Sequence, residues 1–207
     1  MPKIIRLSIL LFFTIEAFSQ EFKPMSDSGG LINGLGKQIE IKTFQAMFVE
    51  TKSISFVQGE LESKGTLAFS NDGNIRWEYK APNASVMVIT QKTIKLRENG
   101  KTKNLKGIGG VLKKVKELIG GCITGDILKD KNYKRSFIES DTEYRVELVP
   151  LQRRMQQIAD FIQVDFTKED LRINSVVMLD SRGDRTSIEF NHLQINKDLP
   201  SGVFILN

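Results

Sequence analysis

The 207-residue chain contains only one cysteine, one histidine and one tryptophan. A single cysteine, Cys122, excludes an internal disulfide, so a hydrophobic core must hold the fold. A single histidine, His192, excludes the histidine clusters of many zinc sites. No Gly-x-Ser-x-Gly or Ser-x-x-Lys motif occurs, and no glycine-rich loop carries the Lys-Ser/Thr pair of a phosphate site. We therefore expect neither a metal nor a cofactor, and no enzymatic activity.

Long apolar runs are also missing, except near the N-terminus. Lys3 and Arg6 precede the apolar stretch 7–15, and Ala17-Phe18-Ser19 places small residues where signal peptidase cleaves. These features predict an export signal over residues 1–19, and a single domain over residues 20–207. The stretch 7–15 is shorter than the roughly 20 residues of a transmembrane helix. Cys122 lies too far from the cleavage site to be lipidated there.

A strong charge of either sign is absent as well. The formal net charge of +5 is spread along the chain, and its densest basic stretch lies between Lys101 and Lys116. A dispersed excess of this size is typical of a solvated surface and does not indicate nucleic-acid binding. We expect a monomer with no nucleic-acid partner.

After the signal, the chain begins with a helical pattern and then alternates as strands do. Apolar residues recur at spacing four over 28–40, which predicts an amphipathic helix. Segments 44–48 and 65–69 place apolar side chains at alternate positions, as does 75–80. The sequence Ser70-Asn-Asp-Gly-Asn74 stands between the last two segments and is typical of a tight turn, so 65–80 is predicted to be a β-hairpin.

A helical insertion interrupts the strands between residues 105 and 128. Its apolar residues follow helical spacing, lysines occupy the opposite face, and glycines stand at both ends. Strands are expected before it at 86–90 and 93–97, and after it at 134–140, 144–149, 158–166, 172–180, 185–190 and 204–206. The pattern predicts an α+β fold with one antiparallel sheet and a few helices.

Apolar side chains are more abundant on these elements than one packed face requires. Ile75, Trp77 and Tyr79 line one side of a strand, and Leu67 and Phe69 line its hairpin partner. Stripes of this kind usually pack against one another as a core. The pattern alone does not separate a filled barrel from one that encloses an empty cavity.

Several segments resemble the periplasmic lipoprotein carrier (LolA) family. They are Phe44-Gln-Ala-Met-Phe48, Gly65-Thr-Leu-Ala-Phe69 and Arg76-Trp-Glu-Tyr-Lys-Ala-Pro82. Leu148-Val-Pro150, the hairpin 176–190 and the terminal Phe204 then follow in the order and spacing of that family. The resemblance therefore spans nearly the whole mature chain.

This resemblance implies an incomplete antiparallel β-barrel of about eleven strands, with a helical lid over an apolar cavity. The implied acyl-chain cavity residues are Leu67, Phe69, Ile75, Trp77, Tyr79, Met87 and Ile89, with Ile75 where the family places an inward aromatic. The implied lid residues are Leu31, Leu35, Ile39, Ile108, Val111, Leu112, Val115, Leu118 and Ile119. One departure concerns the latch of the lid. The family commonly has a basic residue and a proline before the tryptophan strand, where this chain has Asn71-Asp72.

The function implied by the resemblance is that of a periplasmic chaperone that binds lipoprotein acyl chains and carries lipoproteins from the inner to the outer membrane. An inner-membrane lipoprotein-releasing ABC transporter would load it, and an outer-membrane acceptor would unload it. Two alternatives keep the same fold. One is a carrier of another amphiphile, such as a glycolipid or a pigment precursor, and the other is a lipid-sensing interaction module. The identity of the bound ligand separates the two carriers.

Overall fold

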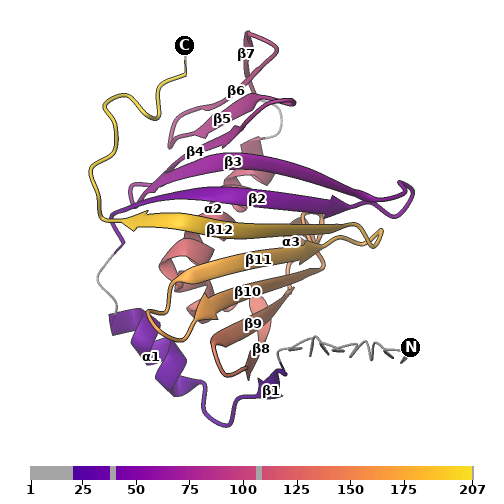
Figure 1. Cartoon of the computed structure of the whole chain (residues 1–207), viewed down its shortest axis with the longest axis vertical. Helices are drawn as coiled ribbons and strands as arrows, with labels where there is room; N and C mark the ends of the chain where they lie inside the picture. The colour runs from indigo at the N-terminus through magenta and orange to yellow at the C-terminus, as the bar shows by residue number, and fades with distance from the viewer. Residues whose placement is uncertain (1–20, 38–40, 106–108, 207) are drawn as a thin grey trace, which may run out of the picture.

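The computed structural model describes residues 21–37, 41–105 and 109–206, which form one curved sheet with a few helices (Figure 1). Ile39, Ile108 and the predicted export signal lie outside these residues. The helical elements are α1 (Gly29–Lys37), α2 (Gly109–Thr124), the 3₁₀ turn η1 (Asp126–Lys129) and α3 (Arg153–Gln156). The strands are β1 (Lys23–Pro24), β2 (Thr43–Ser53), β3 (Glu60–Ser70), β4 (Asn74–Tyr79), β5 (Ser85–Ile89), β6 (Ile94–Glu98), β7 (Lys101–Asn104), β8 (Tyr133–Glu139), β9 (Glu143–Pro150), β10 (Phe161–Thr167), β11 (Ile173–Leu179) and β12 (Arg185–Ile195).

The twelve strands of the described chain form a single antiparallel sheet in the order β1-β8-β9-β10-β11-β12-β2-β3-β4-β5-β6-β7. The β12–β2 pairing joins the C-terminal strands to the N-terminal ones and places Phe190 opposite Phe48. β1 and β7 are the two edges, so the sheet does not close on itself. The expected α+β fold, an incomplete barrel with helices on one side, is confirmed.

Alternation along the central strands places one set of side chains inside the curve of the sheet. On β2 the buried residues are Phe44, Ala46, Phe48 and Glu50, all at alternate positions. The ring of Phe48 lies against Gly65 of β3, at a point where a Cβ would overlap both that ring and the Glu78 carbonyl oxygen. A glycine is therefore needed here for the ring to lie flat on the neighbouring strand.

Helix α2 lies on the inner side of the sheet, behind β2 and β12 in Figure 1. Leu118, Cys122 and Ile123 of the helix are buried in the same core as the inward strand residues. A Cβ at Gly120 would lie 3.3 Å from the Phe69 ring, so glycine lets the helix approach the sheet closely. In the middle of α2, Lys116 lies beside the β3–β4 turn, where its Nζ would be 2.9 Å from a Cβ at Gly73. The helix therefore passes close to the turn that holds Asn71-Asp72.

The prediction of a strand at 204–206 is wrong, because this segment is the end of a turn followed by irregular chain. Its apolar side chains are nevertheless used, since Phe204 and Leu206 pack with Val86 and Val88 on the outer face of β5. Lys95 donates a hydrogen bond to the carbonyl of Leu206 (2.8 Å). The alternating pattern here reflects side chains covering a sheet face and not strand pairing.

Other differences concern short or polar elements. β10 begins at Phe161 and not at Ile158, because Ile158 and Ala159 still donate backbone hydrogen bonds to the carbonyl of Met155 after α3. β1, β7 and α3 were not predicted. The helix predicted over 28–40 is observed as α1 over Gly29–Lys37 within the described residues. In the described ranges, no helix has the length and apolarity that a membrane crossing needs.

Candidate ligand-binding site

A cavity of about 420 Å³ lies between α2 and the inner face of the sheet. This volume falls within the ~300–1,000 Å³ range of small-molecule sites. Its apolar lining comes from β4, β5, β11, β12, α2 and the segments after β2 and α3, and its polar lining comes from β2, the β11–β12 turn and the start of β12. The lining residues are Glu50, Lys52, Ile54, Trp77, Tyr79, Met87, Leu118, Ile119, Ile158, Met178, Asp180, Arg182, Asp184, Arg185, Thr186 and Ile188.

An aromatic cluster supports the apolar wall of this cavity. The ring of Phe48 lies 4.6 Å from that of Trp77 and 5.4 Å from that of Tyr79, centroid to centroid. Such tilted and edge-to-face pairs hold the rings in fixed orientations. Met87 of β5 and Met178 of β11 line the cavity from strands on either side of the central strands of the sheet. Their flexible thioethers suit a surface that adapts to a ligand. The wall can therefore adapt to a flexible aliphatic chain.

A polar cluster around the buried carboxylate of Glu50 lies next to the aromatic rings. The Tyr79 hydroxyl donates a hydrogen bond to Glu50 (2.9 Å), and Lys52 pairs with the same carboxylate at 2.9 Å. Glu50 is only 5% exposed, so both partners offset the cost of burying its charge. Burial raises the pKa of Tyr79 above its ordinary value and the Glu50 carboxylate adds to the rise, whereas the indole of Trp77 acts in the opposite direction.

The indole N–H of Trp77 is buried and finds no hydrogen-bond partner in the described part of the chain. The ring of Trp77 lies 6.4 Å from that of Tyr79, centroid to centroid. A buried donor without a partner costs about 1–3 kcal/mol. The cavity wall therefore holds an unused donor close to its polar cluster.

The open end of the cavity is rimmed by charges that balance one another. Arg182 pairs with Asp180 at 2.7 Å and with Asp184 at 3.2 Å within the β11–β12 turn. The hydrogen bond from Arg182 lowers the pKa of Asp180. Together with Lys52 and Arg185 and with the buried Glu50 of the wall, the cavity lining has three carboxylates and three cations. It can accept polar groups of either sign beside an apolar interior.

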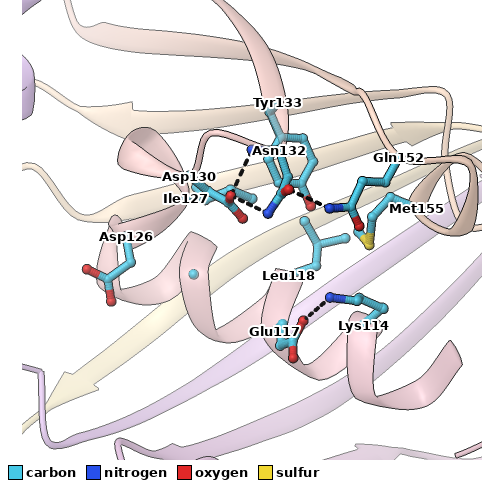
Figure 2. A pocket seen from close by; sticks show the side chains of 11 residues that line it. Lys114, Glu117, Leu118, Asp126, Ile127, Asp130, Asn132, Tyr133, Gln152 and Met155 are labelled. Carbon is cyan, nitrogen blue, oxygen red and sulfur yellow. Dashed lines mark hydrogen bonds and ion pairs between the residues drawn. The ribbon is translucent and has the colours of Figure 1, made fainter. Parts of the chain in front are cut away.

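A second hollow of about 300 Å³ lies on another side of α2 and has several charged and amide side chains among its lining residues (Figure 2). Asn132 donates to Asp130 (2.7 Å) and accepts from Gln152 (2.5 Å), and Lys114 pairs with Glu117 at 2.7 Å. The carboxylate of Asp126 lies at its edge in Figure 2. Because several of its lining groups are charged, this hollow suits an aliphatic ligand less well than the cavity under the sheet.

The structure brings some of the expected site residues together and not others. Trp77, Tyr79 and Met87 line the cavity, as do Leu118 and Ile119 of α2. Leu67, Phe69, Ile75 and Ile89 are instead fully packed in the core and are not among the lining residues. Only the backbone is described at Leu35, Val111, Leu112 and Val115, which lie in α1 and α2.

Helix α1 does not cover this cavity through any described side chain. Leu31 is buried in the common core, and a Cβ at Gly34 would lie 2.9 Å from Leu171, so α1 packs against the β10–β11 connection and η1. Figure 1 places it at the β1–β8 side of the molecule. His192 is exposed at a bulge of β12, outside the cavity lining. The described cover of the cavity is α2 alone.

Sequence reasoning missed Met178, Ile188 and Ile158, and also the charged rim. Met178 and Ile188 belong to the hairpin that was predicted from the sequence, so their alternation with polar residues could have identified them. The rim could not be found in this way, because it joins β2 to a turn about 130 residues further along the chain, as in the hydrogen bond from the Ser55 backbone to Asp184.

Alkaline pH is expected to destabilise the protein partly through Cys122. Burial raises the pKa of this thiol from 9.0 to about 12, so between these values the unfolded state loses the proton and the folded state keeps it. Stability is therefore lost as pH rises through this window. Between pH 7.5 and pH 10.5, the free energy of unfolding should fall for both proteins, but the fall should be roughly 2 kcal/mol smaller for Cys122→Ala than for the wild type. Urea unfolding at both pH values tests this, and equal losses would contradict it.

An open antiparallel sheet curved around a helix, with an apolar cavity between them, is an arrangement typical of ligand-binding proteins. The sequence pattern of the family described as outer membrane lipoprotein carrier protein LolA matches residues 40–207. The chain belongs to this family. Proteins of this family are binding or carrier proteins.

Solved structures show similarity at low sequence identity. A LolA superfamily protein from Nitrosomonas europaea is 10% identical, with a TM-score of 0.44 over 86% of this chain and 96% of that chain. The lipoprotein LppX of Mycobacterium tuberculosis is 8% identical, with a TM-score of 0.45 over 84% and 99%. MucB in the Pseudomonas aeruginosa MucA/MucB complex is 9% identical, with a TM-score of 0.44 over 85% and 59%. No curated protein sequence matches the chain.

Proposed function

We propose that this protein is a periplasmic carrier that shields the acyl chains of lipoproteins in the cavity between α2 and the sheet. The observation that carries the proposal is the cavity itself, which has an apolar wall around Trp77 and Met87 and a charge-balanced rim at its open end. An acyl chain fits the wall, and the attached polar polypeptide fits the rim. Membership of the lipoprotein carrier family supports the same assignment.

The energetics require partners at both ends of the route. Each methylene that leaves a bilayer costs about 0.8 kcal/mol, so two long chains cost more than about 10 kcal/mol if they enter water. The cavity would replace part of the lost apolar contact, but the sequence has no nucleotide-binding motif to drive extraction. An inner-membrane lipoprotein-releasing ABC transporter would supply the energy, and an outer-membrane acceptor with higher affinity would take the cargo.

Helix α2 would act as the movable cover. It lies against the sheet at Gly120, next to the Phe69 ring, and it is followed directly by Gly125, which adopts a left-handed conformation at φ 75°. Such a conformation is easily reached by glycine and marks a sharp change of direction at the end of the helix. A small displacement of α2 would widen the cavity without breaking a strand pairing.

Acylated cargo is expected to change the emission of Trp77, which is the only tryptophan and lines the cavity. Titration with a dipalmitoylated peptide should give a saturable change at one peptide per protein, because the chains replace water beside the indole. The same peptide without acyl chains is the control and should give none. Failure of the acylated peptide to bind would contradict the proposal, and a preference for another amphiphile would change the cargo.

A further inference from the structure

The connection between β2 and β3 exposes apolar side chains at the open end of the cavity. Phe56 is 79% exposed, Val57 is 40% exposed, and Leu61 at the start of β3 is 50% exposed. Figure 1 shows this hairpin projecting beyond the neighbouring strands and the β11–β12 turn. We call Phe56, Val57 and Leu61 the apolar tip. Exposed apolar groups that gather at one projecting point mark a contact surface more often than a scattered set does.

The apolar tip is continuous with the rim of the cavity. Ile54, two residues before Phe56, lines the cavity itself. The next residue, Ser55, donates hydrogen bonds from its backbone N–H (2.9 Å) and its hydroxyl (3.0 Å) to Asp184 of the rim. The turn is closed by the Val57 N–H, which donates to the Ile54 carbonyl (2.9 Å). The tip is therefore held at the mouth and cannot swing freely away from it.

The charges next to the apolar tip are paired within the protein. Lys52 pairs with Glu50 at 2.9 Å, and Lys64 pairs with Glu62 at 3.0 Å. Arg182 is held by the two aspartates of its turn. With the exposed Glu60 next to Leu61 and with Arg185 of the cavity lining, five carboxylates and four cations surround the tip, so the surface has a net charge of only −1. This charge attracts neither an acidic nor a strongly basic partner, and the apolar groups form a projection and not a groove. A fluid lipid surface accepts such a projection without a preformed complementary pocket.

We propose that the apolar tip enters the interfacial layer of a lipid bilayer and holds the cavity mouth against the membrane. The step rests on the proposed carrier function, because it lets an acyl chain pass between bilayer and cavity without crossing water. Docking depends on apolar contact, so it requires no anionic lipid and changes little with salt.

Vesicles of pure phosphatidylcholine test this directly. A fluorescent dye that responds to polarity, attached to Phe56→Cys, should shift to shorter wavelength when vesicles are added and should be quenched by quenchers within the bilayer. The native thiol does not compete for the label, because Cys122 is buried and burial raises its pKa to about 12. Replacing Phe56, Val57 and Leu61 together by serine should weaken flotation with vesicles by about tenfold or more.

The matched control is Ile205→Ser, which removes a side chain that is 63% exposed on the C-terminal segment. It should float with vesicles as the wild type does. Wild-type levels of flotation by the triple variant would overturn the inference, as would a dye that does not respond. Binding that needs anionic lipid and is lost in salt, or binding only to native membranes that contain protein, would overturn it too. In each case the Trp77 titration in solution still decides the carrier function separately.

Discussion

Replacing Ile119 by glutamate is expected to abolish acyl binding while the protein remains folded. Ile119 lies on α2, lines the cavity and is only partly buried, so water can solvate the new carboxylate in the empty state. An entering acyl chain would expel that water and leave the charge without a partner. A penalty of about 3 kcal/mol or more corresponds to a loss of more than about 100-fold in affinity.

The effect should be measured with the dipalmitoylated peptide, and folding should be checked by circular dichroism. Ile119→Leu is the matched control, because it keeps an apolar side chain of the same size, and it should bind within a few-fold of the wild type. If the glutamate variant bound the peptide as the wild type does, the acyl chains would have to lie elsewhere in the molecule.

Replacing Gly65 by alanine is expected to lower the free energy of unfolding by roughly 3 kcal/mol. The added methyl group would overlap the Phe48 ring and the carbonyl oxygen of Glu78, which belongs to the paired strand β4. Neither neighbour can move alone, because Phe48 packs against Trp77 and the carbonyl is part of the sheet. The substitution should also disturb the aromatic wall of the cavity.

Denaturant unfolding measures this effect. Gly30→Ala is the control, since nothing lies within 4 Å of a Cβ at that helical position. The control should be neutral or slightly stabilising, because alanine favours a helix more than glycine does. Equal midpoints for the two variants would show that the contact between Phe48 and Gly65 does not constrain the strands.

The sequence predicted those elements whose signal is local and strong. The hairpin of β3 and β4 was found because apolar alternation on both strands flanks an Asp-Gly turn, and Gly73 there has a φ of 81°. β7 was not found, because Lys101–Asn104 has no apolar residue and its side chains are all exposed. It forms through backbone pairing with β6 alone, which leaves no trace in the apolar pattern.

The site was predicted less completely than the fold for a geometric reason. Alternation shows which face a strand residue occupies, but not how far along the strand the helix above it reaches. Ile75 and Trp77 share one face of β4, yet Ile75 is packed in the core and Trp77 lines the cavity. The boundary is set by where α2 contacts the sheet, as at Phe69 beside Gly120, and this is a tertiary feature.

The measurement that tests the carrier function most directly is native mass spectrometry of the protein purified from the periplasm of a bacterium with two membranes, followed by extraction and identification of the bound molecule. The carrier function predicts a stoichiometric lipoprotein or its acyl fragment, which is absent from Ile119→Glu. An empty protein from cells that contain lipoproteins, or the same bound molecule in both variants, would contradict it.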